Sequence, residues 1–185
     1  MKKIYFLLLI AFGLQLDSLQ AQNYFNYHSF TINDAWTIEK AMGGVENLNP
    51  APVIQTNLKS EQPIPFNRPK IGNIEPASIH YFYTKEDSKV QMVSFSWPTI
   101  QLDSKVVFFT TYKPQMDAIV AEVSKELGTP QTDPSPFSKM KKEPFRGCYE
   151  KYYKWENQHC TVFASLVWSK DKRFVSLSTS IHYKN

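Results

Sequence analysis

Apolar residues at helical spacing mark the most regular stretch of this chain. Five of them recur at intervals of three or four residues and form one face of an amphipathic helix: Met116, Ile119, Val120, Val123 and Leu127. Pro114 suits a first turn, and Gly128 suits the position just after a last turn. The pattern predicts a helix over residues 114–127. Phe109 and Tyr112 continue the apolar stripe backwards, so the helix could start earlier with Pro114 as a kink. In the alternative reading, Val106–Thr111 forms a strand.

A second, shorter helix is predicted within residues 31–44. Asn33 suits its N-cap, Asp34 suits its first turn, and the Gly43–Gly44 pair supplies a left-handed stop. From Val45 to Pro76 the chain carries six prolines and reads as a long irregular segment, with one short strand around Val53–Thr56.

Alternating apolar and polar residues predict strands elsewhere. Ile79–Thr84 and Lys89–Trp97 form a hairpin in which Tyr81 faces Met92 and Tyr83 faces Val90. Three further strands fill the carboxy-terminal segment: Arg146–Trp155, Cys160–Trp168 and Arg173–Tyr183.

The sequence therefore predicts an α+β fold: a single domain over residues 22–185, with an antiparallel β-sheet and the 114–127 helix packed on one face. A predicted helix followed by predicted strands occurs twice along the chain. This order suggests a duplicated α-β-β unit, although no residue-level repeat supports it.

The first 21 residues have the pattern of a secretory signal peptide. Lys2 and Lys3 precede an apolar run from Ile4, and Ala21 offers a small residue at the cut. That run is too short to span a membrane, which takes about 20 apolar residues. We therefore expect a periplasmic or secreted protein with no membrane span after cleavage.

Composition supports a folded, aromatic-rich domain and describes its surface. Hydrophobic residues make up 42% and aromatic residues 15% of the chain. Residues 139–185 contain ten Lys and Arg against four Asp and Glu, a net charge of +6. Such a basic end either faces an anionic partner or is a solvated surface. The modest total charge and the expected export argue against nucleic acid.

The two cysteines, Cys148 and Cys160, could form a disulfide if the protein is exported. A regular hairpin that pairs Glu156 with His159 would hold them about 23 Å apart, too far for a bond. A looped excursion between them would permit it. The hairpin is the preferred interpretation.

Catalytic and metal-binding motifs are absent from the sequence. The four histidines are scattered singly, without the spacing typical of metal ligands. The sequence also contains no nucleophile elbow and no phosphate-binding loop. We expect no cofactor, no metal and no catalytic residue. An enzymatic site would have to be assembled from scattered residues such as His80, His182 and Asp103.

One aromatic and basic run is the candidate binding surface. Tyr149, Lys151, Tyr153 and Trp155 share one face of a strand and could stack on sugar rings or pair with anions. The alternative is cross-strand aromatic packing covered by lysine stems.

These features favour a non-enzymatic binding or interaction module of the cell envelope, whose ligand is a protein or an anionic or carbohydrate molecule. Two alternatives are a small exported hydrolase and an inhibitor or immunity-type protein that presents the 45–76 segment.

The export hypothesis gives a direct prediction. The mature protein should begin at or near Gln22, because Ala21 is the small residue that follows the apolar run. Intact-mass measurement of protein recovered from the envelope tests this, and a full-length mass would contradict it.

Overall fold

The computed structural model describes residues 30–48, 63–68, 77–97, 108–132, 138–139, 148–169 and 174–184. The amino-terminal signal pattern and the predicted strand around Val53–Thr56 lie outside these residues.

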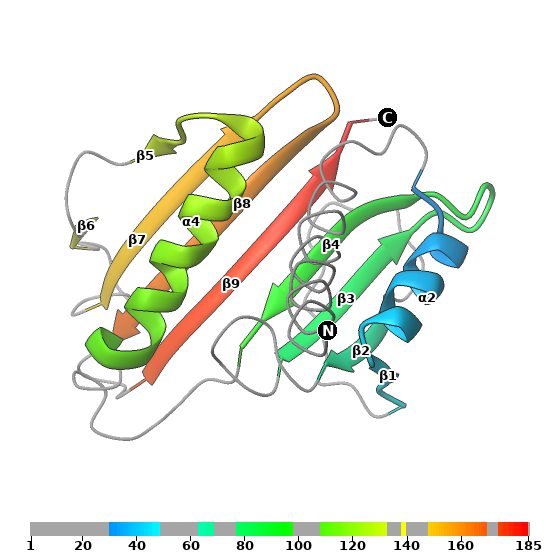
Figure 1. Ribbon diagram of the computed structural model, residues 1–185, viewed down its shortest axis with the longest axis horizontal. Coiled ribbons are helices and arrows are strands. Elements are labelled where there is room, and N and C mark those ends of the chain that lie inside the picture. Colours follow the sequence, from blue (N-terminus) through cyan, green and yellow to red (C-terminus); the bar gives the residue numbers. More distant parts are fainter. Residues whose placement is uncertain are drawn as a thin grey trace, which may run out of the picture.

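One antiparallel sheet of nine strands carries the fold (Figure 1). Its order is β1-β2-β3-β4-β9-β8-β7-β5, with β6 beside β7. The strands are β1 (Val45–Glu46), β2 (Ile64–Arg68), β3 (Ala77–Tyr83), β4 (Val90–Ser96), β5 (Gln131–Thr132), β6 (Ser138–Lys139), β7 (Cys148–Glu156), β8 (Cys160–Ser169) and β9 (Phe174–Tyr183). The helices of the described residues are α2 (Ile32–Ala41) and α4 (Lys113–Leu127), the latter continuous with a π-helical turn, η1 (Phe108–Tyr112).

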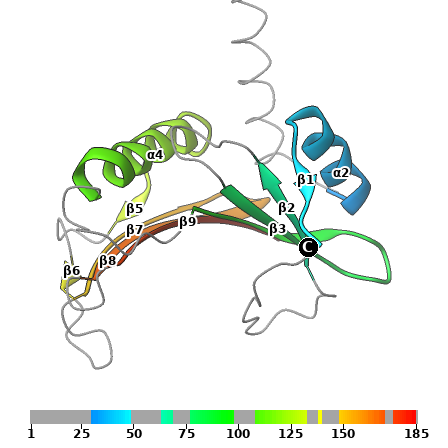
Figure 2. The same ribbon diagram turned by 90° about the horizontal axis from the view of Figure 1, so that it is seen from below.

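Both helices lie on the same face of the sheet. Figure 2 shows α2 over the β1–β3 end and α4 over the β7–β9 end, while the sheet arches with its concave side away from them. Helix α4 contacts β7 and β8, and α2 contacts β3. The predicted α+β class, with an antiparallel sheet and the amphipathic helix packed on one face, is confirmed.

Helix α4 buries the face that its sequence pattern predicts. Met116 and Val123 are buried, and Ile119, Val120 and Leu127 pack against the same core. The alternative of a strand over Val106–Thr111 is wrong for its described part, because η1 continues the helix backwards through Tyr112. Tyr112 is itself buried, so the buried apolar face of α4 continues backwards into η1.

Helix α2 begins earlier than predicted. Its N-cap is Thr31 rather than Asn33, because Thr31 and Asp34 form a reciprocal capping box. The backbone N–H of Thr31 donates to Asp34 Oδ2 at 2.9 Å. Asn33 falls inside the first turn, where its carbonyl accepts a bond from the Thr37 hydroxyl. The predicted left-handed stop is present at Gly43, whose φ is +71°.

The Pro-rich 45–76 segment is more regular than predicted. It contributes β1 and β2, and β2 includes Pro65. The Pro65 carbonyl accepts from the Asn47 N–H at 2.8 Å, so the side of Pro65 that lacks a donor faces the end of the short edge strand β1. A proline in that position loses little pairing.

The β3–β4 hairpin has the predicted pairing near its turn and a shifted one beyond it. Tyr83 pairs with Val90 as predicted, but Tyr81 pairs with Val93 instead of Met92. A bulge between Phe82 and Tyr83 shifts the register by one residue and sends Tyr81 into the core.

The β7–β8 hairpin is regular, but its predicted register is wrong by two residues. Glu156 pairs with Thr161 rather than with His159. The side chain of Asn157 explains this, because its Oδ1 accepts from the backbone N–H groups of His159 and Cys160 at 2.8 and 2.7 Å. This Asx-type turn widens the loop.

The same register holds the two cysteines apart. Cys160 lies beside Asn157, nine residues beyond Cys148 along β7. At about 3.3 Å per residue this is roughly 30 Å, far beyond the reach of a disulfide. Cys160 is buried, and that burial raises the pKa of its thiol to about 11.

The strand order is symmetric about the pairing of β4 with β9. Helix α2 is followed in sequence by β1–β4, and α4 is followed by β5–β9. The two groups meet where Ser94 pairs with Ser180 at the centre of the sheet. One helix followed by strands therefore occurs twice among the described elements, but each helix is followed by at least four strands rather than by the two of the predicted α-β-β unit.

The packing of α4 gives a prediction. Val123→Asp should lower the free energy of unfolding by about 3 kcal/mol, because it would bury a charge against the sheet. Ala121→Asp, at an exposed position of the same helix, should cost under about 1 kcal/mol. Urea denaturation measures both, and equal losses would contradict the packing.

The hairpin geometry gives another prediction. Alkylation in denaturant without reductant should modify both thiols on each chain, as read by mass spectrometry. Under native conditions at pH 8 Cys160 should stay unmodified, because it is buried and protonated there. A bridged peptide pair joining Cys148 to Cys160 would contradict the register.

Candidate binding site

A buried ion pair joins α2 to the sheet. Glu39 in α2 is fully buried, and both of its carboxylate oxygens accept from the guanidinium of Arg68 in β2. The distances are 2.8 Å from Arg68 Nε to Oε2 and 2.8 Å from Arg68 Nη2 to Oε1. The hydroxyl of Tyr81 in β3 also donates to Oε1. Three elements therefore meet at one carboxylate.

This cluster is satisfied in the way that a buried charge requires. An isolated buried carboxylate is costly, whereas a two-pronged arginine contact and a third donor compensate it. The turn after α2 fits closely around the cluster. The Gly44 N–H donates to the Glu39 carbonyl at 2.7 Å, and a Cβ at Gly44 would collide with Glu39 Oε2.

A pocket of about 450 Å³ lies beside this cluster. It is formed by the outer face of α2, the turn that follows and the first two strands. Its lining residues are Trp36, Thr37, Lys40, Gly43, Gly44, Val45 and Phe66. Among the described lining residues the walls are therefore mostly apolar, with one ammonium group and one hydroxyl.

The pocket carries exposed apolar surface. Trp36 is 40% exposed, and its ring packs edge-on against buried Phe66 with 4.8 Å between centroids. Val45 is 68% exposed and Leu48, three residues further along the chain, is 80% exposed. In the described part of the chain, these three are the exposed large hydrophobic residues. Trp36 and Val45 both line the pocket, and adjoining exposed apolar side chains of this kind are typical of a binding surface.

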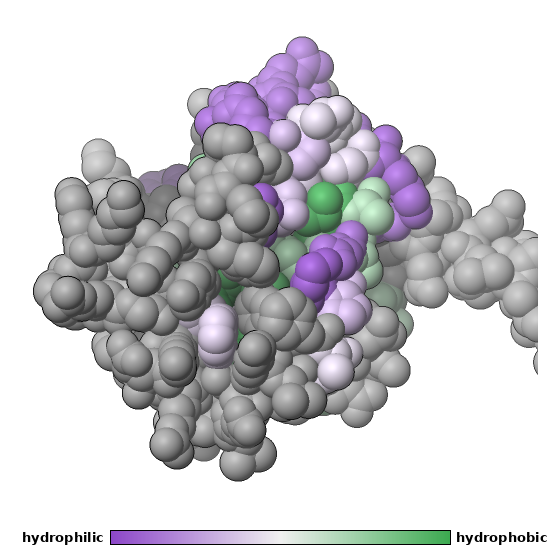
Figure 3. Space-filling view, turned by 90° about the vertical axis from the view of Figure 1, so that its left-hand side faces the viewer, coloured by the Kyte–Doolittle hydropathy of each residue, from purple (hydrophilic) through white to green (hydrophobic). Residues whose placement is uncertain are grey.

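Figure 3 shows the opposite side of the molecule, which bears β5 and β7. Among its coloured residues, hydrophilic ones dominate the upper part and a small apolar area lies between them. The exposed large hydrophobic residues of the described chain lie between residues 36 and 48, in α2, β1 and the residues after β1.

In the predicted binding run, Tyr153 and Trp155 lie on the sheet face that carries α4. Tyr153 and Trp155 stack with 5.9 Å between ring centroids, and Lys151 Nζ lies 5.3 Å from the Tyr153 ring. Trp155 is buried, and its indole N–H donates to Ser124 in α4 at 3.1 Å. Tyr149 pairs with Trp168 at the far end of β7. The arrangement of Tyr153 and Trp155 is that of core packing.

The two histidines named for a hydrolase lie on the face away from the helices. His80 is in β3 and His182 in β9, with Ser94 of β4 between their strands. The His182 Nε2 lies 3.0 Å from the Ser180 hydroxyl, and its ring packs edge-on against Phe163. Burial lowers the pKa of both histidines, so both are neutral at pH 7. Asp103 lies outside the described residues.

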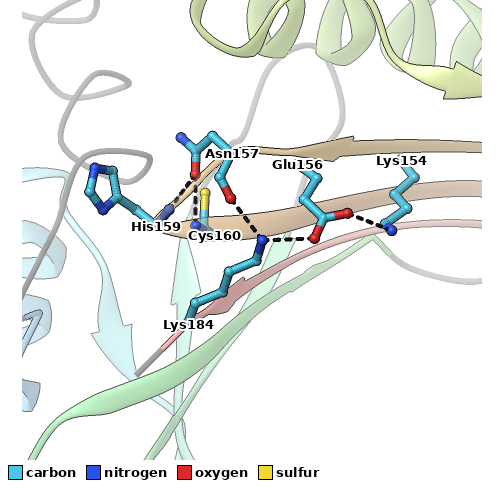
Figure 4. Close-up of polar contacts among 6 residues, drawn as sticks. All are labelled: Lys154, Glu156, Asn157, His159, Cys160 and Lys184. Carbon is cyan, nitrogen blue, oxygen red and sulfur yellow. Dashed lines mark hydrogen bonds and ion pairs between the residues drawn. The ribbon is translucent and has the colours of Figure 1, made fainter.

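A polar cluster fixes the β7–β8 turn against the end of β9 (Figure 4). Lys184 donates to Glu156 Oε1 at 2.7 Å and to the Asn157 carbonyl at 2.8 Å. Lys154 donates to Glu156 Oε2 at 2.8 Å. The hydrogen bonds from Lys154 and Lys184 lower the pKa of Glu156 to about 2. These contacts link the end of β7, the β7–β8 turn and the residue after β9, so the cluster acts as a structural clamp. Within the described residues, no group of three or more potential ligands is placed to hold a metal ion.

Comparisons with known proteins find no relative of this chain. No protein-family model, no curated protein and no solved structure matches it.

The ion pair gives a prediction. Arg68→Met should lower the free energy of unfolding by about 3–5 kcal/mol, because it leaves the Glu39 carboxylate buried without its counter-ion. The double change Glu39→Gln with Arg68→Met should cost less than Arg68→Met does by itself.

Lys125→Met is the matched control, because it removes a lysine from the exposed pair with Glu122. It should cost under about 1 kcal/mol. A loss at Arg68 no larger than the loss at Lys125 would contradict the role of the buried pair.

Proposed function

We propose that this protein is an exported, non-enzymatic binding module of the cell envelope that holds its ligand at the Trp36 pocket. The observation that carries the proposal is a tryptophan 40% exposed to solvent at the wall of a pocket of about 450 Å³. Ligand sites are commonly concave, mostly apolar and supplied with a few polar groups.

The base of the pocket supports this role. Phe66 is 1% exposed and lies in β2 two residues from Arg68. The Glu39–Arg68 pair fixes β2 against α2, so the walls of the pocket keep their positions without a ligand. A preorganised site loses less conformational entropy on binding. An exposed tryptophan on such a base resembles the residues that dominate binding energies at interfaces.

The envelope location is supported by the amino-terminal sequence. The basic start, short apolar run and Ala21 have the order of a secretory signal. In the described residues, no helix has the length and apolar character needed to cross a membrane.

A hydrolase is the second candidate, and one contact favours it. The 3.0 Å separation of Ser180 and His182 is a distance at which a base could activate a nucleophile. A triad also needs a group that orients the base. Within the described residues, no carboxylate contacts His182, so the pair is incomplete as observed. Labelling of Ser180 by a fluorophosphonate probe would support this candidate over the binding module.

The inhibitor alternative depends mainly on residues 49–62 and 69–76, which lie outside the described residues. Within the same segment, Val45 is exposed and lines the pocket, and Leu48 is exposed three residues further along the chain. The binding-module proposal already includes them.

Capture from an envelope extract tests the proposal. The chain from Gln22 onward is immobilised, and bound proteins and small molecules are identified by mass spectrometry. Trp36→Ala is compared with Tyr152→Ala, which truncates a half-buried aromatic side chain on the other face of the sheet.

A molecule retained by the unmodified chain and by Tyr152→Ala, but lost with Trp36→Ala, is the expected result. The proposal fails if no retained molecule depends on Trp36, or if retention depends on Tyr152 instead.

A further inference from the structure

We propose that the Trp36 pocket binds a small amphiphilic anion, with its apolar body against Trp36 and Phe66 and its anionic group at Lys40. This inference rests on the proposed function and names the chemistry of its ligand.

The apolar half of the proposal follows from the walls. The Trp36 and Phe66 rings meet edge to face at 4.8 Å, and Val45 contributes a branched aliphatic side chain. Binding of an alkyl or aryl group against these walls is favourable by about 25 cal/mol for each Å² of apolar surface removed from water. The volume of about 450 Å³ falls in the lower part of the range for ligand pockets, roughly 300–1,000 Å³, and indicates a small ligand.

The anionic half follows from Lys40. This exposed lysine lines the pocket, and among the described residues its ammonium has no acidic partner. By contrast, Lys113 and Lys125 on α4 each contact a carboxylate at 2.6 Å. The other polar side chain in the lining, Thr37, already donates its hydroxyl to the Asn33 carbonyl at 3.0 Å. Lys40 is therefore the group that would orient a charged ligand.

The two nearby acids do not oppose an anion in the pocket. Glu39 lies behind Gly44, but Arg68 neutralises its carboxylate and Tyr81 adds a third hydrogen bond. Glu46 follows Val45 in β1 but is not among the lining residues. Lys40 also complements the dipole at the carboxy-terminal end of α2, and that role leaves its ammonium available to a ligand.

Calorimetric titration with three ligands of equal chain length tests the chemistry. Decanoate and decyltrimethylammonium are used below the concentrations at which they form micelles, and decanol is used below its solubility limit in water. The proteins are the mature chain, Trp36→Ala, Lys40→Met and Lys85→Met. Lys85 is an exposed lysine in the β3–β4 turn, outside the pocket lining, and serves as the matched charge control.

Decanoate should bind most tightly. Lys40→Met should weaken decanoate about three- to fivefold, as expected for a solvent-exposed ion pair, and leave decanol unchanged. Trp36→Ala should weaken both ligands at least about tenfold. Lys85→Met should change neither.

Equal binding of decanoate and the ammonium ligand, or decanoate binding that is insensitive to Lys40, would overturn the anionic assignment. If no amphiphile binds while capture from the extract still depends on Trp36, the ligand class is wrong and the proposed function stands. If neither depends on Trp36, both proposals fail.

Discussion

The ion pair between Glu39 and Arg68 is the constraint on which the amino-terminal half of the structure depends. Burying a carboxylate and a guanidinium costs several kcal/mol each unless their hydrogen bonds are made, so the pair tolerates little displacement of α2 along β2. Both charges are almost completely buried, and Tyr81 connects them to β3. The close approach of Gly44 to Glu39 then fixes the turn that forms one wall of the pocket. The geometry of the candidate site therefore depends on one buried electrostatic contact.

Different interactions hold α2 and α4 against the two ends of the sheet. Helix α4 is held by an apolar face and by the hydrogen bond from Trp155 to Ser124. Helix α2 is shorter, and it combines a few apolar contacts with the ion pair to Arg68. The outer side of α2 remains partly uncovered at Trp36, whereas in β7 Trp155 is buried against α4 and Tyr153 is half-buried. This asymmetry is why the candidate site lies at the α2 end, although the sequence pointed to the aromatic run of β7.

The structural features that depend on the periodicity of apolar residues were predictable from the sequence. Spacing of Met116 to Leu127 is sufficient to define α4, and alternation along Cys160–Trp168 defines the buried face of β8, because both patterns follow from local backbone geometry. The register of strand pairing was harder to predict from the sequence. The bulge beside Tyr83 and the turn made by the Asn157 side chain each shift the pairing by one or two residues. The Glu39–Arg68 pair had no sequence signal, because its partners are 29 residues apart and each resembles an ordinary surface charge. The alternation that puts Tyr153 and Trp155 on one face was predictable, but the burial of Trp155 against α4 required the tertiary structure.

Amide correlation spectra by NMR report where a ligand touches the folded chain, and they therefore test whether the Trp36 pocket is the binding site. The labelled mature protein would be titrated with the envelope fraction that it retains. We expect chemical-shift changes concentrated at the Trp36 indole and at the amides of Gly43, Gly44 and Val45, with Ser94, Ser180 and His182 unchanged. Changes concentrated at Ser94, Ser180 and His182 would instead place the functional surface on the opposite face of the sheet and rule out the Trp36 pocket.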